Sequence, residues 1–519
     1  MTDRAGQSKK QSTGQSKWRA AAAGLLTGAA GLAVSLAATA LLRERLTPPD
    51  AVAEAVIGAT PGKAVKALID LLGRWDKPLL IVGVVAVLAL LSAVAGVLAR
   101  RRTWHGQLVF VAMGALAAAA VLTRPQSTLS AVIPVLAGAL ACLAVLPLLV
   151  APIVPSSRRG SDADTVEASR RRFLLRAGIV GLGALVVGVG SRFLGRQRRI
   201  VEAARSDLDL PVTDGVVPSG AELDLPELPP WRSPNDEFYR IDTAVVVPAV
   251  EAARWRLRIH GMVEREVVVT YQDLLDRGLT EAWVTLCCVS NPIGGQLIGN
   301  AWWSGVRVAD LLAEAGPLAE ADAVLQTSED GWTCGTPLEA LTDDRDALLA
   351  VAMNGEALPL EHGFPVRMVV PGLYGYVSAT KWVVDLEVSR FADFDAFWTG
   401  KGWGEEGPVR TQSRIDVPRS NHRVMAGQVR VGGVAWAQHT GIEAVEVRLD
   451  GGAWTEVSLG RVPSTDTWAQ WAGTVEADPG VHTLAVRATD ASGYVQTGVQ
   501  RGVLPDGATG WHTIEFTAE

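Results

Sequence analysis

The sequence predicts three parts in order: an α-helical membrane anchor of five spans, an α+β domain and an antiparallel β-sandwich. The first observation behind this prediction is composition, because 48% of the 519 residues are hydrophobic and 20% are charged, against about 25% charge in ordinary soluble proteins. The second is the concentration of long apolar runs in residues 1–199. The third is a change to short alternating strands from about residue 410.

Five apolar stretches in the first part are each long enough to cross a bilayer, which takes about 20 helical residues. They cover residues 20–42, 79–99, 106–123, 129–152 and 173–194. Five such runs without a polar face are not expected of buried helices in a soluble protein. Residues 1–199 are therefore predicted to form a membrane domain with five transmembrane helices and the lipid bilayer as a partner.

Lys and Arg residues give this anchor an orientation. They cluster before the first span, after the second, and between the fourth and fifth. Placing all three clusters in the cytoplasm satisfies the positive-inside rule. The prediction is a multi-pass protein of the cell membrane, with everything after the fifth span on the extracytoplasmic side.

The two halves of the chain differ in charge. Residues 1–200 hold 25 Lys and Arg against 9 Asp and Glu, whereas the remaining residues hold 23 against 46. An acidic second half repels phosphate, so nucleic acid is not an expected partner. The four cysteines are too few for a disulfide scaffold.

The residues before the fifth apolar stretch carry a candidate export signal. Ser169 to Leu174 reads S-R-R-x-F-L and precedes a run rich in Gly and Ala, a pattern that resembles a twin-arginine signal. The alternative is an ordinary arginine anchor on the cytoplasmic side. A twin-arginine route would carry the following domain across the membrane already folded, as a cofactor inserted in the cytoplasm requires.

The second half divides by pattern into three segments. Residues 200–234 are charged and then rich in Pro, Asp and Glu, so they are expected to form a linker, with compact structure beginning near Asn235. In residues 235–405, β-rich runs alternate with short helical patterns, which predicts an α+β catalytic domain. Residues 410–519 repeat strand patterns about every 8–12 residues, which predicts an all-β immunoglobulin-like sandwich.

The clearest chemical feature is the pair Cys287-Cys288, followed closely by Asn291 and by the glycines 294, 295 and 299. On residue types alone, these thiols could be structural, nucleophilic or metal-binding. No C-x-x-C or suitably spaced His completes a zinc site in the sequence. Residue types alone leave these three alternatives open.

The segment from Thr285 to Asn300 resembles the cysteine loop of the sulfite oxidase family of molybdopterin enzymes. In that family, one thiolate binds molybdenum together with the dithiolene of one pterin, and Asn follows the ligand after one or two small residues. This register makes Cys288 the metal ligand and catalytic residue, with Cys287 as its neighbour. A soft thiolate suits such a metal, and a single one leaves positions open for chemistry.

Three further segments match in the family's order. They are P-N-x-x-F-Y at 234–239, H-G-x-P-x-R-x-x-x-P at 362–371, and the loop ending in Lys-Trp at 374–382. The resemblance implies that the pterin and its phosphate are held by Asn235, Tyr239, Arg240, Ser328, His362, Arg367, Ser378, Ala379, Thr380 and Lys381. Ser328 also has a simpler interpretation, that of a turn serine.

The resemblance implies an exported, membrane-bound oxidoreductase with a molybdenum-molybdopterin cofactor. Its expected reaction is two-electron oxygen-atom transfer on a small-molecule substrate, most simply a sulfur compound. Since the second half contains no haem motif, the electrons would pass to a separate electron carrier or a membrane redox partner. Residues 410–519 resemble the family's dimerisation domain, so a homodimer is a further expectation.

Two departures from the family bear on the substrate. Sulfite oxidases have an arginine shortly after the cysteine, where this chain has Pro292 and Ile293. The expected tyrosine after the Lys-Trp loop is missing, and Trp398 and Trp403 occupy that region. An anion without cationic partners is poorly bound, so sulfite itself is not the favoured substrate.

Three alternatives therefore stay open. The first is a sulfoxide reductase with the same fold. The second is a thiol enzyme without molybdenum, with Cys288 as nucleophile and His362 as base. The third is a surface binding module in which the cysteines are structural.

Overall fold

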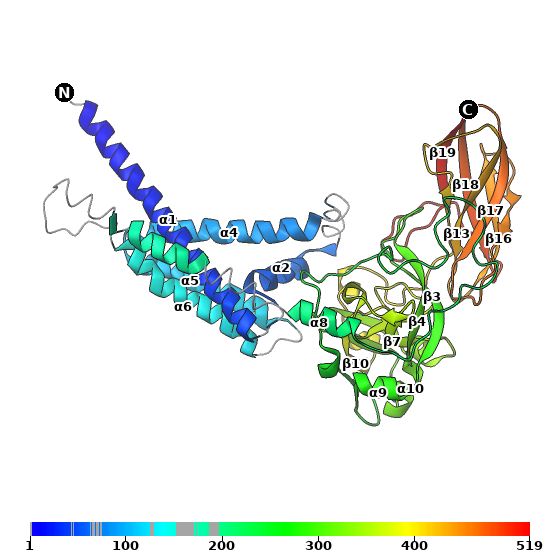
Figure 1. Cartoon of the computed structure of the whole chain (residues 1–519), viewed down its shortest axis with the longest axis horizontal. Coiled ribbons are helices and arrows are strands. Elements are labelled where there is room, and N and C mark those ends of the chain that lie inside the picture. Colours follow the sequence, from blue (N-terminus) through cyan, green and yellow to red (C-terminus); the bar gives the residue numbers. More distant parts are fainter. Residues whose placement is uncertain are drawn as a thin grey trace. The chain divides into compact units, whose positions relative to one another are not determined.

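The computed structural model describes residues 3–42, 44, 46–62, 64, 68, 72, 75–124, 129–151, 171, 172, 174–185 and 197–519. The chain forms two compact units. The first contains Met1–Ile200 with Thr243–Val247, and the second contains Val201–Asp242 with Pro248–Glu519. Figure 1 shows the helical first unit in blue to cyan and the largely β-structured second unit in green to red.

Helices make up the first unit. They are α1 (Asp3–Leu42), α2 (Pro48–Ala59), α4 (Asp76–Ala99), α5 (Thr103–Leu122), η2 (Leu129–Val132) and α6 (Ile133–Val150). Among the described residues, the helices long and apolar enough to cross a membrane are Lys17–Leu42, Lys77–Ala99, Thr103–Leu122 and Leu129–Val150. These four agree closely with the first four predicted stretches.

The fifth predicted span is described only in part. Leu174–Leu185 forms a shorter apolar helix. Residues 186–196, together with Ser169, Arg170 and Phe173 of the candidate export signal, lie outside the described residues. The fifth span and the signal therefore stay predictions.

Small residues let the helices of the first unit pack closely. A Cβ on Gly24 of α1 would overlap the backbone carbonyl of Ser92 in α4, and one on Gly31 would overlap Cys142 Sγ in α6. Contacts of this kind are how helices associate where no water drives them together. Cys142 is accordingly a buried packing residue between α1 and α6.

The α+β part of the second unit is built on two sheets. Their orders are β2-β1-β10-β5-β6 and β3-β4-β7-β8, with β9 paired to β7. The strands are β1 (Arg256–Gly261), β2 (Val267–Thr270), β3 (Thr280–Cys287), β4 (Ile298–Arg307), β5 (Ala323–Ser328), β6 (Thr333–Pro337), β7 (Leu348–Met353), β8 (Glu356–Ala357), β9 (Arg367–Val369) and β10 (Val383–Ser389). The helices are α8 (Gln197–Ser206), η3 (Ala252–Arg254), α9 (Tyr271–Asp276), α10 (Val308–Ala315), α11 (Glu339–Thr342), η4 (Leu360–His362), η5 (Phe391–Asp393) and η6 (Thr399–Lys401).

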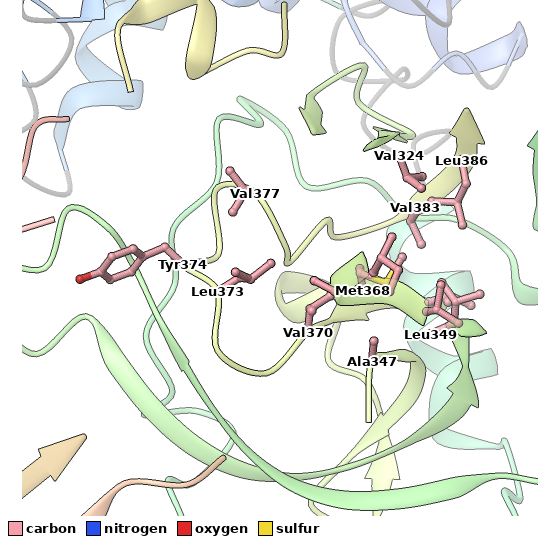
Figure 2. Packing of buried hydrophobic residues seen from close by; sticks show 14 of the residues in the cluster. Val324, Ala347, Leu349, Met368, Val370, Leu373, Tyr374, Val377, Val383 and Leu386 are labelled. Carbon is pink, nitrogen blue, oxygen red and sulfur yellow. The ribbon is translucent and has the colours of Figure 1, made fainter. Parts of the chain in front are cut away.

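Apolar side chains from both sheets meet in one core. Leu349 of β7 and Met368 of β9 lie close to Val383 and Leu386 of β10 (Figure 2). Every residue of β7 is buried, which explains why its sequence is a continuous apolar run rather than an alternating one. Because Met368 packs in this core, the neighbouring first residue of β9, Arg367, is also held at a buried position.

The C-terminal part consists of two further sheets, ordered β11-β13-β17-β16 and β12-β19-β18-β14-β15. The strands are β11 (Gln412–Val417), β12 (Arg423–Val424), β13 (Gly427–Trp436), β14 (Ile442–Leu449), β15 (Thr455–Glu456), β16 (Ser458–Leu459), β17 (Ala469–Ala477), β18 (Gly480–Asp490) and β19 (His512–Ala518). Val431 and Trp471 of one sheet share a core with Val447 and Phe516 of the other. The two sheets thus form a sandwich, and its immunoglobulin-like type stays a prediction.

The segment 200–234 differs from the expected linker, because compact structure begins well before Asn235. Ala221 and Trp231 are fully buried. Trp231 Nε1 donates to the carbonyl of Trp468 at 3.1 Å, and the Leu223 N–H donates to Gln470 Oε1 at 2.7 Å. The sequence conceals this packing because an extended segment that lies along other strands needs no apolar period of its own.

Candidate functional site

The cysteine pair lies where β3 ends and a tight loop begins. Cys287 is the last residue of β3, and Cys288 follows it. The Cys288 N–H donates to the Leu297 carbonyl at 2.9 Å, while the Cys288 carbonyl accepts the Asn291 N–H at 3.0 Å. Asn291 Oδ1 accepts the Leu297 N–H at 2.9 Å and closes the loop. Residues 288–297 are called the cysteine loop below.

Both thiols are buried, with 1% of Cys287 and 8% of Cys288 exposed. All four cysteines of the chain are free thiols. Burial raises the pKa of Cys288, and hydrogen bonds from Ser290 and the charge of Lys381 partly oppose this rise. A thiolate at Cys288 would therefore need further positive charge beside it, as a metal ion supplies.

The loop 374–382 is joined directly to the cysteine pair. The Gly375 N–H donates to the Cys287 carbonyl at 3.0 Å. A Cβ on Gly375 would lie 3.6 Å from Tyr239 Oη, so Tyr239 reaches the same point. The Ala379 N–H donates to the Gly375 carbonyl at 3.1 Å, and Ser378 Oγ donates to the Tyr374 carbonyl at 3.0 Å. These bonds fold the loop back on itself beside the cysteines.

His362 is the last residue of the short helix η4. One of its ring nitrogens has a hydrogen-bond partner, and the other has none among the described residues. Its Nε2 contacts the Asn235 carbonyl at 2.9 Å. Its Nδ1 is buried and has no hydrogen-bond partner among the described residues. Burial, reinforced by the charges of Arg367 and Lys381, lowers the pKa of His362 to about 4. A buried polar atom without a partner calls for an explanation, and a bound ligand or water is one.

Arg367 is a buried cation at the start of β9, with only 3% of its surface exposed. Its Nη1 donates to the His362 carbonyl at 3.2 Å, and its guanidinium lies 5.0 Å from the centre of the Trp303 ring. Burial lowers the pKa of Arg367 to about 10, and no carboxylate of the described residues opposes that effect. Such a guanidinium provides a site for an anion.

Gly363 brings His362, Arg367 and Lys381 together. Its φ is +111°, a value that L residues rarely adopt. A Cβ there would lie 2.9 Å from the Arg367 Cβ and 3.2 Å from the Lys381 Cα. The turn therefore needs glycine both for its backbone conformation and for the close approach.

Lys381 is also buried, and it has an anionic partner inside the chain. Its Nζ lies 3.1 Å from Asp242 Oδ2, which Arg240 Nε also approaches at 3.1 Å. Burial lowers the pKa of Lys381 to about 8, although the neighbouring Asp242 raises it. The lysine is thus held in place next to Arg367 by a buried carboxylate.

Three predicted residues lie beside these groups, but their side chains interact with the chain itself. The Asn235 side chain is occupied by the chain itself, since Nδ2 donates to Glu356 Oε1 at 2.6 Å and Oδ1 accepts from Asn354 Nδ2 at 2.8 Å. Its backbone carbonyl is what reaches His362. Arg240 is exposed. Ser328 Oγ accepts the Asp330 N–H at 3.4 Å, which is the turn-serine arrangement.

Thr380 is fully buried and contacts another cysteine. Its Oγ1 lies 3.2 Å from Cys334 Sγ. Cys334 therefore lies beneath the 374–382 loop as a free thiol and forms no disulfide with Cys287. Thr380 supports the loop from below through this contact.

Sequence reasoning missed two residues of the site, Asp242 and Trp303. Trp303 lies under Arg367, but β4 is buried along almost its whole length, so no alternation in its sequence distinguishes Trp303 from Trp302. Asp242 follows Arg240 by two positions, but nothing local predicts that it would pair with Lys381, 139 residues away. A buried ion pair between residues so far apart in the sequence is visible only in the folded structure.

Comparison with known proteins identifies a family of similar enzymes. Residues 244–398 match the model of the oxidoreductase molybdopterin binding domain. The chain is 32% identical over 180 residues to an uncharacterized oxidoreductase, YuiH, of Bacillus subtilis, covering 35% of this chain and 87% of that protein. It is 31% identical over 338 residues to the sulfite oxidase of Gallus gallus, covering 54% of this chain and 72% of that protein.

The chain belongs to the sulfite oxidase family of molybdopterin oxidoreductases. It is an oxidoreductase, its cofactor is molybdenum-molybdopterin, and the α+β part is the family's molybdopterin domain. The human mitochondrial sulfite oxidase is 29% identical over 271 residues, which cover 49% of that protein. A solved structure, the sulfane dehydrogenase SoxCD of Paracoccus pantotrophus, matches 56% of this chain and 83% of that chain at 26% identity, with a TM-score of 0.48.

The residues present fit the family's cofactor. The buried Arg367 offers a planar fork for a phosphate, and the unpaired Nδ1 of His362 offers a hydrogen bond to a polar heterocycle. Both groups would be costly if they had no ligand. Cys288 offers the soft donor that molybdenum prefers.

Proposed function

We propose that Cys288 is the molybdenum ligand, and that His362, Arg367, Lys381 and the 378–380 segment hold the pterin and its phosphate. The observation that carries this proposal is the buried Arg367 without a carboxylate, next to a histidine whose Nδ1 is unpaired. An unpaired buried cation is costly unless an anion joins it. A phosphate group is the anion that this cofactor brings.

The chain's own residues would bind and orient the cofactor. Arg367 and Lys381 would supply positive charge to the phosphate, and the 374–382 loop would supply backbone N–H groups. When bound, the molybdenum-pterin group supplies two-electron oxygen-atom transfer. Tyr239 and the buried walls of the cysteine loop would exclude bulk water and so strengthen every charge interaction inside the site.

The substrate that we propose is an uncharged or weakly charged sulfur compound. In place of the arginine that sulfite oxidases carry after the cysteine, this loop has Pro292 and Ile293. The nearest buried arginine of the sandwich, Arg414, is already paired with Asp416 at 2.8 Å. A dianion such as sulfite would lack the cations that it needs. Reduction of a sulfoxide is the second candidate, because an uncharged sulfoxide does not need the arginine that this loop lacks.

A thiol enzyme with Cys288 as nucleophile receives no support. Burial raises the pKa of Cys288 and lowers that of His362 to about 4, so neither thiolate nor imidazolium is favoured. His362 Nε2 contacts the Asn235 carbonyl instead of the thiol. A surface binding module likewise leaves the buried Arg367 without a purpose.

We further propose that the enzyme is anchored in the cell membrane by its first 199 residues and works on the extracytoplasmic side. The four apolar helices and the arginine clusters support the anchor and its orientation. The family chemistry requires an exit for two electrons. A separate electron carrier or a membrane redox partner would take them.

The test is to purify the full chain in detergent, measure molybdenum and pterin per chain, and assay turnover with a redox dye. About one molybdenum per chain and faster turnover of neutral sulfur compounds than of sulfite are the expected results. The substrate proposal fails if sulfite is turned over with the highest kcat/KM. The cofactor-binding proposal fails if Arg367→Met and His362→Ala leave the pterin content unchanged.

A further inference from the structure

The β-sandwich holds the strand that leads into the cysteine loop. Thr285 lies on β3 two residues before Cys287. Its N–H donates to the Asp466 carbonyl at 2.9 Å, and its Oγ1 accepts the Trp468 N–H at 2.9 Å. Its carbonyl accepts from Gln438 Nε2 at 3.3 Å. All three partners belong to the sandwich, so the strand is fixed from that side before the thiols are reached.

The sandwich also holds the far side of the same loop. Arg414 of β11 donates from Nη1 to the Gly295 carbonyl at 2.9 Å. Next to it, a Cβ on Gly294 would overlap the ring of His512 from β19, and Gly294 has a φ of +72°. The loop and the sandwich therefore approach as closely as a glycine allows.

Arg414 is held rigidly for this contact. It is 5% exposed, and its Nε donates to Asp416 Oδ1 at 2.8 Å. A buried ion pair adds little net stability, but its fixed geometry can direct a guanidinium fork at one acceptor. Here that acceptor is the Gly295 carbonyl.

Apolar packing continues across the same junction. Cys287 and Val289 share one core cluster with Val434, Trp436 and Trp468 of the sandwich. The cysteine pair therefore lies on a core that the two parts build together. A change in the sandwich can reach the thiols without unfolding either part.

We propose that Arg414 is a positioning residue for Cys288, because it holds the Gly295 carbonyl and so fixes the loop that carries the thiol. The inference rests on the proposed ligand role of Cys288. The loop is closed by bonds between Cys288, Asn291 and Leu297. Gly295 lies within this closed loop, so a shift of Gly295 would also shift Cys288. The sandwich then serves the site of its own chain, whatever its role in dimerisation.

The test compares two neutralised ion pairs in the full-length, molybdenum-loaded protein. Arg414→Gln with Asp416→Asn removes the contact without leaving a buried charge unpaired. Arg487→Gln with Glu446→Gln is the matched control. This ion pair lies in the other sheet of the sandwich, has an N–O distance of 2.7 Å, and is not part of the cysteine loop. The readouts are the Mo(V) electron paramagnetic resonance signal, kcat and the melting temperature.

We expect the Arg414/Asp416 variant to keep its molybdenum, to show a shifted or broadened Mo(V) signal, and to lose about 10–100-fold in kcat, as other residues behind a metal ligand do. The control should keep the wild-type signal and kcat even if its melting temperature falls. A wild-type signal and kcat in the Arg414/Asp416 variant would overturn the proposal and leave Arg414 with a structural role only.

If the double variant does not fold, Arg414→Lys replaces it. A lysine keeps a cation beside Asp416 but cannot serve the carboxylate and the Gly295 carbonyl with one planar fork. The same shift of the Mo(V) signal is expected, and an unchanged signal contradicts the proposal. Cys288→Ser distinguishes a failure of the ligand assignment from a failure of the positioning role. A wild-type Mo(V) signal in Cys288→Ser would refute both the ligand assignment and the positioning role. A changed Mo(V) signal in Cys288→Ser, together with an unchanged signal in the Arg414 variants, would refute only the positioning role.

Discussion

Arg367 and His362 show how single residues reveal a ligand. A buried guanidinium without a carboxylate and a buried imidazole nitrogen without a partner are both unfavourable in an empty protein. Their neighbours do not relieve the cost, because Lys381 is a second cation and Asp242 is directed at it. The proposed binding of the cofactor, rather than stability, would explain why these groups lie here.

Arg367→Met tests this interpretation through opposite effects on two measurements. Because methionine removes a buried unpaired charge, the cofactor-free protein should be unchanged or more stable, by up to about 1–4 kcal/mol. The pterin content after expression in a host that makes molybdopterin should fall severalfold, because the phosphate loses its fork. Melting curves and pterin fluorescence check the two effects. Arg423→Met, on an exposed residue of β12 in the sandwich, should change neither, and normal pterin content in Arg367→Met would refute the assignment.

Turns and loops place these residues at the element scale. Gly363 ends η4 with a φ of +111°, and its missing Cβ leaves room for Arg367 and Lys381. Gly402 ends η6 in the same left-handed conformation, with a φ of +94°, but a Cβ there would meet nothing within 4 Å. A comparison of the two positions therefore separates the effect of backbone strain from the effect of crowding at the site.

We predict that Gly363→Ala and Gly402→Ala both lower the free energy of unfolding by about 1–3 kcal/mol, because alanine is strained at these values of φ. Gly363→Ala alone should lower the pterin content, because its Cβ displaces Arg367 or Lys381. Chemical denaturation and pterin fluorescence measure the two effects. Equal pterin content in the two variants would show that Gly363 acts only through its backbone.

The elements that carry sequence signals could be predicted, and those that depend on distant partners could not. The four apolar helices follow from composition, and the cysteine loop and the H-G-x-P-x-R segment follow from short motifs. Asp242 gave no local sign, because its partner Lys381 is distant in sequence. The 200–234 segment was expected to be a linker, since an extended segment that packs on strands has no apolar period. Arg414 was missed because it lies in another part of the second unit.

At the scale of the whole molecule, the proposed export would be linked to cofactor insertion. The family's cofactor must be enclosed in a folded domain, and an unfolded chain outside the cell could not acquire it. The Ser169 to Leu174 motif would therefore deliver the domain folded. The four earlier apolar helices have their own charged flanks and would need no such delay.

Replacing Arg170 and Arg171 together by Lys should leave the first four helices in the membrane and strand a folded, molybdenum-loaded domain in the cytoplasm. Protection from protease added outside the cell, together with molybdenum analysis, checks this result. A single replacement is less decisive, because Arg172 could supply a shifted pair. Normal external exposure of the double variant, still loaded with molybdenum, would show that the motif is only a positive-inside anchor.

The central claim is that Cys288, rather than its neighbour Cys287, ligates molybdenum. The two thiols have different surroundings, since Asn291 Nδ2 lies 3.9 Å from Cys287 Sγ, whereas the charge of Lys381 acts on Cys288. X-ray absorption at the molybdenum edge counts the sulfur neighbours of the metal directly in the wild type, Cys288→Ser and Cys287→Ser. Cys288→Ser should show one sulfur neighbour fewer than the wild type and almost no turnover, whereas Cys287→Ser should match the wild type. A sulfur lost in Cys287→Ser, or none lost in Cys288→Ser, would contradict the account.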